Sequence, residues 1–320
     1  MCRRVALVGL GNVAQSHIRA LEPLLNVEEV VGVDPEPSSR LSFRGAPIEV
    51  YSDLAPALAR PVGLVIVATP TSSHSAVVAS VRRIDTEVAI LLEKPAAGTR
   101  ADAEWLLGDP VRAEVVLHLS FAPEVLWGFS LYRTRARDLG RVTSFHGWFG
   151  DPYGVAPEAR RLSYGDSWLD SGINGLGVLA RFTLPGFGVD GRRFPRFLST
   201  CEVHFDLHEE PSTERGSIFT TWQAAEGSRW THLVFENGDH MMMDHTAGTG
   251  ALYTRGSVAE FFAYQGPGLR RDLHYVNFYS DYFGTKQYQF PVAVAQRLHT
   301  ILFAAADCLN SGSRDRIARG

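Results

Sequence analysis

Residues 4–14 of the chain read RVALVGLGNVA, and this stretch decides the fold. Its first half is an unbroken apolar run, which is typical of a buried strand. Its second half is a G-x-G-x-x-A turn, after which apolar residues follow at helical spacing up to Leu25. Such a turn lets the backbone approach a pyrophosphate at a helix N-terminus, and its small last residue allows the helix to pack close to the sheet. The stretch predicts a βαβ unit that binds a dinucleotide through Gly9, Gly11, Asn12, Val13 and Ala14. The alternative is a tight turn without a ligand.

A carboxylate stands where such a unit would hold the adenosine ribose. Asp34 ends the second predicted strand, 30–34, and would accept hydrogen bonds from the ribose hydroxyls. The same carboxylate repels a 2′-phosphate, which favours NAD over NADP, while the positive charge of Arg40 weakens this preference. The alternative for Asp34 is a strand-end turn before Pro35.

Strands and helices alternate from this stretch up to about residue 120. The further predicted strands are 63–69, 88–93 and 113–120, and helices are predicted over 73–84 and 100–107. Continuous apolar strands separated by helices indicate a parallel sheet that is covered on both faces. We therefore expect a Rossmann domain over residues 1–121.

The pattern changes after Pro123, where a helix to about residue 137 leads into longer strands. Strands are predicted at 141–149, 196–207, 216–224 and 229–235, and Asn237-Gly238 is a hairpin signal. The chain is therefore expected to be an α/β protein whose second domain, 122–320, is built on a large, open, mostly antiparallel sheet. A final apolar helix is predicted at 291–310, and packing of this helix back on the first domain is one option.

Composition limits the class of protein. A chain of 320 residues predicts two domains, and the net charge of −4 gives no reason to expect a nucleic acid or an acidic membrane surface as partner. The sequence contains no uninterrupted run of about 18 apolar residues, so no membrane-spanning helix is predicted. Three scattered cysteines favour reduced thiols, and hence the cytosol. His204 and His208 would lie about 13 Å apart on one strand, so no metal site is expected.

The scarcity of lysine distinguishes one residue. Of the 31 lysines and arginines, only Lys94 and Lys286 are lysines. Arginine replaces lysine wherever a positive charge is enough, so a retained lysine suggests a need to release a proton.

Four segments occur in an order that resembles the glucose–fructose oxidoreductase, inositol dehydrogenase and MocA (Gfo/Idh/MocA) family. The resemblance runs through the first domain and the start of the second, and it becomes weak after about residue 180. The matching segments are VALVGLGNVAQSHIRAL at 5–21, VIVATPTSSHSAVV at 65–78, LLEKPAAGT at 91–99 and DLGRVTSFHGWF at 138–149.

The resemblance implies an NAD(P)-dependent oxidoreductase that holds a small-molecule substrate between a Rossmann domain and an open-sheet domain. It implies that Lys94 stands beside the nicotinamide and the substrate oxygen, where it donates or accepts a proton. It further implies a homodimer or tetramer. The implied cofactor contacts after the glycine-rich turn are Thr69, Pro70, His74, Glu93 and Lys94. The alternatives are packing of His74 against the sheet, and a surface strand end for Lys94.

Residues 167–177, SWLDSGINGLG, depart from the family's usual G-G-G-x-L-x-D-x-G-x-H-x-x-D. Asp170 fits the pattern, but Asn174 stands where the histidine is expected and Gly177 where the second aspartate is expected. The histidine normally serves as general base in alcohol oxidation, and asparagine has no usable pKa. Asp170 could alternatively be the N-cap of the following helix.

Three accounts of this altered motif remain open. In the first, Lys94 alone transfers the proton and Asn174 only holds a substrate such as a sugar or keto-sugar. In the second, the substrate is a cyclic imine or another C=N compound, and Asp170 stabilises its positive charge. In the third, the protein is a non-catalytic sensor of NAD or a sugar. We rank the carbonyl reductase first, the imine reductase second and the sensor third, with Lys94, Asp170 and Asn174 as the candidate catalytic residues.

Overall fold

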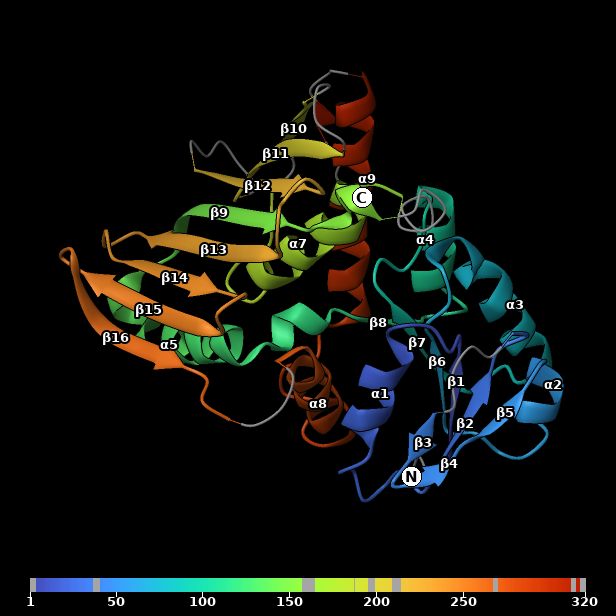
Figure 1. Cartoon of the computed structure of the whole chain (residues 1–320). Helices are drawn as coiled ribbons and strands as arrows, with labels where there is room; N and C mark the ends of the chain where they lie inside the picture. The colour runs from blue at the N-terminus through green and yellow to red at the C-terminus, as the bar shows by residue number, and fades with distance from the viewer. Residues whose placement is uncertain are drawn as a thin grey trace. The chain divides into compact units, whose positions relative to one another are not determined.

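A computed structural model describes residues 4–36, 41–156, 165–186, 188–194, 199–208, 214–266, 270–311 and 315–316. The chain forms two compact units (Figure 1). The first comprises Met1–His118 and Gly268–Gln296, and the second comprises Leu119–Pro267 and Arg297–Gly320. The predicted domains, 1–121 and 122–320, differ from these units chiefly because residues 268–296 return to the first.

The first unit is built on a parallel six-stranded sheet in the order β5-β2-β1-β6-β7-β8. The strands β1, β6 and β7 are almost entirely buried, which explains their unbroken apolar sequences. The predicted Rossmann sheet is thereby confirmed. The strand bounds are β1 Arg4–Val8, β2 Glu29–Val33, β5 Glu49–Tyr51, β6 Leu64–Val67, β7 Ala89–Glu93 and β8 Glu114–Val116, with a separate small hairpin of β3 Ser42–Phe43 and β4 Ala46–Pro47.

Helices follow the strands of the first unit. Their bounds are α1 Ala14–Leu21, α2 Leu54–Ala57, η1 Thr71–Ser73, α3 His74–Ile84 and α4 Arg100–Leu107; η2 His118–Phe121 begins at the last residue of the first segment and continues in the second unit. A further helix, α8 Arg270–Phe283, packs against α1, although some 250 residues separate the two in the sequence. The sequence patterns did not predict α8. Its packing on α1 is the physical reason why residues 268–296 belong to the first unit.

The second unit contains a nine-stranded sheet in the order β16-β15-β14-β13-β9-β12-β11-β10-β17. Every neighbouring pair is antiparallel except β12 and β9, which run parallel. The predicted large, mostly antiparallel sheet is therefore confirmed as a mixed sheet. Its strands are β9 Val142–Gly150, β10 Gly188–Arg193, β11 Thr200–Asp206, β12 Arg215–Thr221, β13 Ser228–Phe235, β14 His240–Asp244, β15 Thr249–Thr254, β16 Ser257–Ala263 and β17 Asp315–Arg316.

Helices cover one face of this sheet. Gly128 of α5 (Pro123–Leu139) lies against the side chains of Met241 and Met243, while Met242 between them points to the other face and is 40% exposed. Burial alternates along β11 and β13, as expected for a sheet with one covered face. The remaining elements are η3 Tyr153–Val155, η4 Trp168–Gly172, α7 Ile173–Leu179 and α9 Val292–Ser311.

The final helix α9 is the one described helix that is long and apolar enough to cross a membrane. More than half of its apolar window, 56%, is buried inside the protein. The core helix of a soluble protein has the same length and composition, so α9 is weak evidence for a membrane segment.

Candidate functional site

The glycine-rich turn of the first unit has the geometry that its sequence requires. Gly9 has a φ of +91°, and a Cβ there would lie 2.7 Å from the backbone nitrogen of Thr69, so only glycine fits. By contrast, a Cβ on Gly11 would meet nothing within 4 Å. Gly11 and Asn12 are exposed, Val13 is half-buried, and Ala14 is fully buried at the start of α1. The open space at Gly11 beside the start of α1 is suited to a pyrophosphate.

Asp34 lies directly beside this turn. Its carboxylate accepts the backbone N–H of Leu10 at 2.8 Å and that of Glu36 at 2.9 Å. The bond from Leu10 connects Asp34 to the glycine-rich turn. The bond from Glu36 forms the strand-end turn that is the alternative role of Asp34. Two carboxylate oxygens offer about four acceptor positions, so the ribose hydroxyls could still be bound. Arg40 lies outside the described residues.

The segment after β6 is held by His74. The imidazole is 1% exposed, and its Nδ1 and Nε2 lie 2.9 Å from the carbonyl oxygen of Ala96 and 3.0 Å from that of Thr69. Burial lowers the pKa of His74, although the two carbonyls oppose the shift. A neutral imidazole has one N–H, so it donates to one carbonyl at a time. His74 thus holds the backbone beside half-buried Thr69 and exposed Pro70. These contacts are those of a buried side chain that packs against the sheet.

Glu93, at the end of β7, is the centre of a buried polar network. Its Oε1 accepts the hydroxyl of Tyr275 at 2.8 Å and lies 3.0 Å from Nε2 of His17. Its Oε2 accepts the backbone N–H of Lys94 at 3.1 Å. On the other side of the imidazole, Nδ1 of His17 lies 2.6 Å from the hydroxyl of Tyr279. The network joins β7 to α1 and α8 and fixes the backbone that carries Lys94.

The charge of Glu93 is stabilised by this network. Burial alone would raise the pKa of Glu93, but the hydrogen bonds from His17 and Tyr275 and the positive charge of Lys94 outweigh it and lower the pKa. Glu93 is 7% exposed. No sequence pattern indicated the roles of His17, Tyr275 and Tyr279. His17 does lie within the quoted fingerprint segment, but nothing in the sequence relates that segment to α8.

Lys94 follows Glu93 and is half-buried. The peptide bond from Lys94 to Pro95 is cis. All the predicted cofactor contacts therefore lie in the first unit, at or near the carboxyl ends of β1, β2, β6 and β7.

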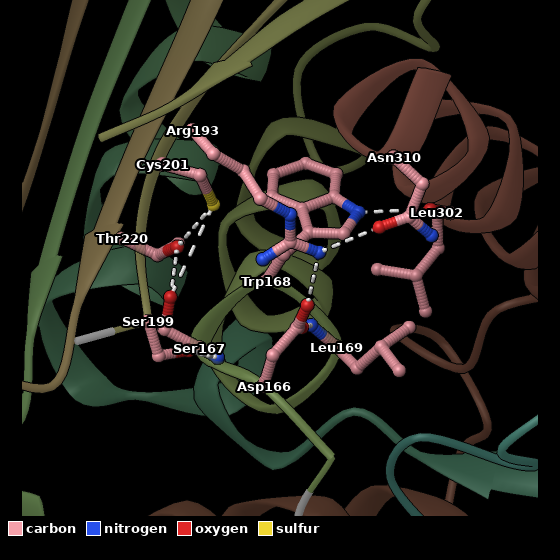
Figure 2. Close-up of polar contacts among 10 residues, drawn as sticks. All are labelled: Asp166, Ser167, Trp168, Leu169, Arg193, Ser199, Cys201, Thr220, Leu302 and Asn310. Carbon is pink, nitrogen blue, oxygen red and sulfur yellow. Dashed lines mark hydrogen bonds and ion pairs between the residues drawn. The ribbon is translucent and has the colours of Figure 1, made fainter. Parts of the chain in front are cut away.

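The motif at 167–177 lies in the second unit, and the residues before Asp170 anchor it (Figure 2). The side chain of Asp166 accepts the backbone N–H of Leu169 at 2.9 Å and the guanidinium of Arg193 at 2.7 Å. Trp168 is fully buried and donates its Nε1–H to the carbonyl oxygen of Leu302 in α9 at 2.8 Å. These contacts fix the turn from which Asp170 projects.

Two glycines of the motif are explained by packing. A Cβ on Gly172 would lie 2.5 Å from the indole of Trp168. A Cβ on Gly175 would lie 2.8 Å from the ring of Phe149 and 2.9 Å from Ile218, because α7 lies close against the sheet. Gly172 and Gly175 therefore allow close packing.

Asp170 and Asn174 occupy successive turns of this segment. Asp170 is 8% exposed and lies inside η4, whereas Ser167 and Gly172 are the N-caps of η4 and α7. The N-cap interpretation of Asp170 is therefore wrong. Asn174 is 5% exposed, and its Nδ2 lies 3.5 Å from the carbonyl oxygen of Asp170, which is a long hydrogen bond.

An ion pair between half-buried Arg229 and buried Asp151 lies beside Asp170, and no sequence pattern indicated it. Arg229, at the start of β13, donates from Nη2 to Oδ1 of Asp151. The other carboxylate oxygen of Asp151 accepts the hydroxyl of Ser171 at 2.7 Å. Burial opposes the charge of Arg229, but Asp151 and, more weakly, Asp170 raise the pKa of its guanidinium. Strand ends bring these residues together, and their spacing in the sequence gives no signal of it.

Within the described part of the chain, no group of three or more His, Cys, Asp and Glu side chains is arranged to hold a metal ion. The candidate residues fall into two sets. The cofactor contacts and Lys94 belong to the first unit, and Asp170 and Asn174 belong to the second.

Known proteins resemble the two parts of the chain to different degrees. Residues 3–121 match the family model GFO_IDH_MocA, an oxidoreductase family with an NAD-binding Rossmann fold. The rhizopine catabolism protein MocA of Rhizobium meliloti is 32% identical over 127 residues, which are 38% of this chain and 39% of that protein. The match thus spans well under half the length of this curated relative.

Solved structures resemble the whole chain in fold. A myo-inositol dehydrogenase of Corynebacterium glutamicum has a TM-score of 0.76 at 15% identity, with both chains fully covered. Levoglucosan dehydrogenase in complex with NADH and L-sorbose has a TM-score of 0.80 at 14% identity, with 99% of each chain covered. The WlbA dehydrogenase of Bordetella pertussis, in complex with NADH and UDP-GlcNAcA, has a TM-score of 0.76 at 16% identity, with 100% and 98% covered. Both units thus have the fold of these dehydrogenases, and residues 3–121 are similar to the Gfo/Idh/MocA family of oxidoreductases with an NAD-binding Rossmann fold.

Proposed function

We propose that the protein is an NAD-dependent oxidoreductase of a small polar substrate such as a sugar or keto-sugar. The proposal rests on the geometry of the predicted cofactor site. An open glycine-rich turn lies beside Asp34, and buried Glu93 holds the backbone of Lys94 at the end of β7. When bound, NAD would supply or accept a hydride at C4 of its nicotinamide. The residues fit this cofactor, since Gly11 leaves space for the pyrophosphate and Asp34 favours an unphosphorylated ribose.

The chain's own groups would then move a proton and hold the substrate. We assign the proton transfer to Lys94, because Asn174 cannot serve as a base in place of the usual histidine. Asp170 and Asn174 would orient the substrate. The hydrogen bond from the backbone N–H of Lys94 to the carboxylate of Glu93 would hold Lys94 in position. The cofactor contacts are assigned to Gly9, Gly11, Asn12, Val13, Ala14, Asp34, Thr69 and Pro70, with His74 and Glu93 positioning Thr69 and Lys94.

Sugar-like compounds in related folds support this substrate class. Levoglucosan, L-sorbose and UDP-GlcNAcA were bound to dehydrogenases that share the fold. Reduction of a C=N substrate is the second candidate, and buried Asp170 without a neighbouring histidine in the motif favours it. A carboxylate there would stabilise an iminium ion, which accepts a hydride without a strong acid.

Turnover of NADH separates these functions. Purified protein would be mixed with NADH and a panel of ketoses, keto-sugars and cyclic imines, and oxidation would be followed by absorbance. We expect turnover with a sugar-like carbonyl compound. Turnover of imines alone would support the second candidate. Tight NADH binding without turnover of any compound would contradict both and favour a sensor of NAD or a sugar.

We also propose that the protein is cytoplasmic and forms a homodimer or tetramer. The face of the nine-stranded sheet opposite α5 carries Met242, Val258 and Phe261, which are 40%, 56% and 66% exposed. Exposed apolar groups on one sheet face are suited to association. Sedimentation velocity would measure the assembly, and a monomer at micromolar concentration would contradict the proposal.

A further inference from the structure

Three side chains with metal-binding atoms lie on the open face of the nine-stranded sheet, the face opposite α5. They are His232 of β13 and His240 and Met242 of the neighbouring strand β14 (Figure 1). His232 is directly opposite Met242 in the antiparallel register. His240 and Met242 are two residues apart on one strand, so their side chains are on the same face. None of the three belongs to the predicted cofactor site or to the motif at 167–177.

The two imidazoles bring one nitrogen each close together. Nε2 of His232 lies 2.9 Å from Nδ1 of His240. Without an ion, one of these nitrogens donates its N–H to the other, because a neutral imidazole has one donor and one acceptor. Two imidazole nitrogens bound to one ion at about 2.0–2.1 Å, at an angle of about 90–110°, lie about 2.8–3.4 Å apart. The pair therefore has the spacing of a chelate. When an ion binds, the shared proton moves to the other nitrogen of its own ring.

Both rings are held in place by their neighbours. The ring of His240 stacks on Tyr253 of β15, with the centroids 4.8 Å apart and an interplanar angle of 11°. The ring of His232 stacks on His146 of β9 at 6.4 Å and 18°. Both nitrogens of His146 are within hydrogen-bond distance of serine hydroxyls, at 3.0 Å and 2.9 Å. Neighbours that orient a metal ligand before the ion arrives strengthen the binding.

The surroundings of the two histidines permit a cation to bind. Burial, His240 and His146 lower the pKa of His232, so this imidazole is neutral near pH 7 and keeps its lone pair. Burial likewise lowers the pKa of His146. Among the described residues, no lysine or arginine is a cross-strand neighbour of either histidine; these neighbours are His146, Met242, Val234 and Tyr253.

Met242 adds a third ligand of a different kind. Its side chain is 40% exposed and flexible. Directly opposite residues of antiparallel strands have Cβ atoms about 4.5–5.5 Å apart, so its sulfur can reach an ion bound by His232. A thioether is a soft ligand that favours Cu(I), whereas Zn²⁺ and Ni²⁺ are bound well by imidazoles alone. Two nitrogens and one thioether therefore favour copper over the other transition metals.

We propose that His232, His240 and Met242 bind one Cu(I) ion on the open face of the sheet. All three ligands belong to one chain, so the site does not require the association proposed for this face. The site lies in the second unit, whereas the residues assigned to NAD belong to the first. It is a binding site in addition to the proposed oxidoreductase function.

Competition with a chromophoric Cu(I) chelator measures the binding. Protein would be added under anaerobic conditions to the Cu(I) complex of bicinchoninate, and the loss of its absorbance followed. Every chain would carry Cys2→Ser, because a cysteine thiolate also binds Cu(I). The other two cysteines, Cys201 and Cys308, are buried. We expect one Cu(I) ion to bind per chain.

Histidine variants test the chelate. His232→Gln and His240→Gln should each lower the affinity for Cu(I) at least about tenfold, because each removes one ligand. His204→Gln is the matched control. His204 is half-buried on the same face, but its Nε2 lies 3.5 Å from a carboxylate oxygen of Glu202 and not beside another imidazole. This variant should bind Cu(I) as the parent does, and circular dichroism would confirm that each variant is folded.

Methionine variants test the choice of metal. Met242→Leu keeps the size and apolar character of the side chain, so it should lower the affinity for Cu(I) about fivefold or more and leave that for Zn²⁺ unchanged. Met243→Leu is the control, since Met243 is fully buried on the covered face. X-ray absorption at the copper edge should show two nitrogens and one sulfur around the ion in the parent, and no sulfur in Met242→Leu.

The proposal is open to contradiction at each ligand. No binding of Cu(I) at micromolar concentration, or parental affinity in His232→Gln or His240→Gln, would overturn the site. Parental affinity for Cu(I) in Met242→Leu would overturn it as a copper site. None of these measurements uses NADH turnover, so they are independent of whether the proposed reaction takes place.

Discussion

At the scale of single residues, Lys94 is distinguished by the proton that it can release. Lys94→Arg should keep the positive charge and the affinity for NADH but reduce turnover about 10²–10⁴-fold, because a guanidinium holds its proton near neutral pH. Lys286→Arg is the matched control, since Lys286 stands over the ring of Tyr282 at 5.0 Å and an arginine can do the same. Steady-state kinetics and NADH fluorescence give the two readouts. Full turnover by Lys94→Arg would show that another group transfers the proton.

The choice of cofactor is a property of Asp34. Its carboxylate is held by the N–H groups of Leu10 and Glu36 and cannot readily turn away from a 2′-phosphate. We expect NADH to bind about 1–3 kcal/mol more tightly than NADPH, since NADPH would bury an unpaired charge. Isothermal titration with both cofactors measures the difference. Asp34→Ser should narrow it, and equal affinities in the wild type would remove Asp34 from the ribose site.

The altered motif can be tested by restoring or removing one group at a time. If the substrate is a carbonyl compound, Asn174→His should raise the rate of alcohol oxidation, although Gly177 supplies no carboxylate to orient the imidazole. If the substrate is an imine, Asn174→His should change little and Asp170→Asn should reduce turnover about tenfold or more, because the counter-charge is lost. Rates of both variants on a sugar and on an imine would be compared. Equal effects on the two substrates would support neither account.

Sequence alone predicts residues whose role is local. The positions of Gly9 and Ala14 could be predicted because both belong to one turn, and those of Asp34 and Lys94 because each directly follows a recognisable strand; their roles stay predictions. Arg229 could not, because it reaches Asp151 only through the pairing of β9 and β13. The N-cap prediction for Asp170 was wrong because Asp166, four residues earlier, already provides the polar group at the start of the turn.

At the scale of elements, one buried carboxylate links α1, β7 and α8. The pKa of Glu93 lies below its ordinary value of 4.5, so the folded protein binds this proton less readily than the unfolded chain. Ionised Glu93 therefore stabilises the fold above pH 4.5, and this contribution is lost as the pH falls through and below that value.

Glu93→Gln should remove this pH-dependent part of the stability. We expect the free energy of unfolding in urea to fall by about 2 kcal/mol at pH 7, and the difference from the wild type to shrink toward pH 3. Glu104→Gln in α4 is the control, because Glu104 is exposed. A difference that stays constant between pH 7 and pH 3 would mean that the charge of Glu93 does not stabilise the fold.

The packing of helix α8 could not be predicted from its own sequence. Its sequence, RRDLHYVNFYSDYF, is rich in tyrosine and phenylalanine, but no local pattern indicates which surface these rings cover. Tyr275 and Tyr279 can be fully buried because both hydroxyl groups have partners. Tyr275 donates its hydroxyl to Glu93, and the hydroxyl of Tyr279 lies 2.6 Å from Nδ1 of His17. Partners this far away in the sequence are determined by the fold as a whole.

At the scale of the whole molecule, the larger part of the second unit, Leu119–Pro267, separates the two segments of the first unit in the sequence, and the rest of it, Arg297–Gly320, follows them. The two crossings of the chain lie close together, since the Nδ1 atoms of His118 and His274 are 3.4 Å apart. Residues 1–118 joined to 268–296 by a short glycine–serine linker should therefore fold and bind NADH. Residues 1–121, the domain predicted from sequence, should be unstable because α1 lacks α8. Circular dichroism and NADH fluorescence of both chains test this, and a stable, NADH-binding 1–121 chain would contradict it.

The dependence of Glu93 on Tyr275 also bears on how the protein is made. A ribosome releases the glycine-rich turn and Lys94 early, but α8 emerges only after Leu119–Pro267 of the second unit has been synthesised. At the usual rates of translation, the roughly 175 residues between Lys94 and Arg270 correspond to a delay of about 9–35 s. During this interval the nascent chain carries a dinucleotide-binding region whose central carboxylate has only part of its final partners. We therefore expect NAD to be captured late, close to the end of translation, and chains that terminate before residue 275 to be recognised by chaperones and proteases.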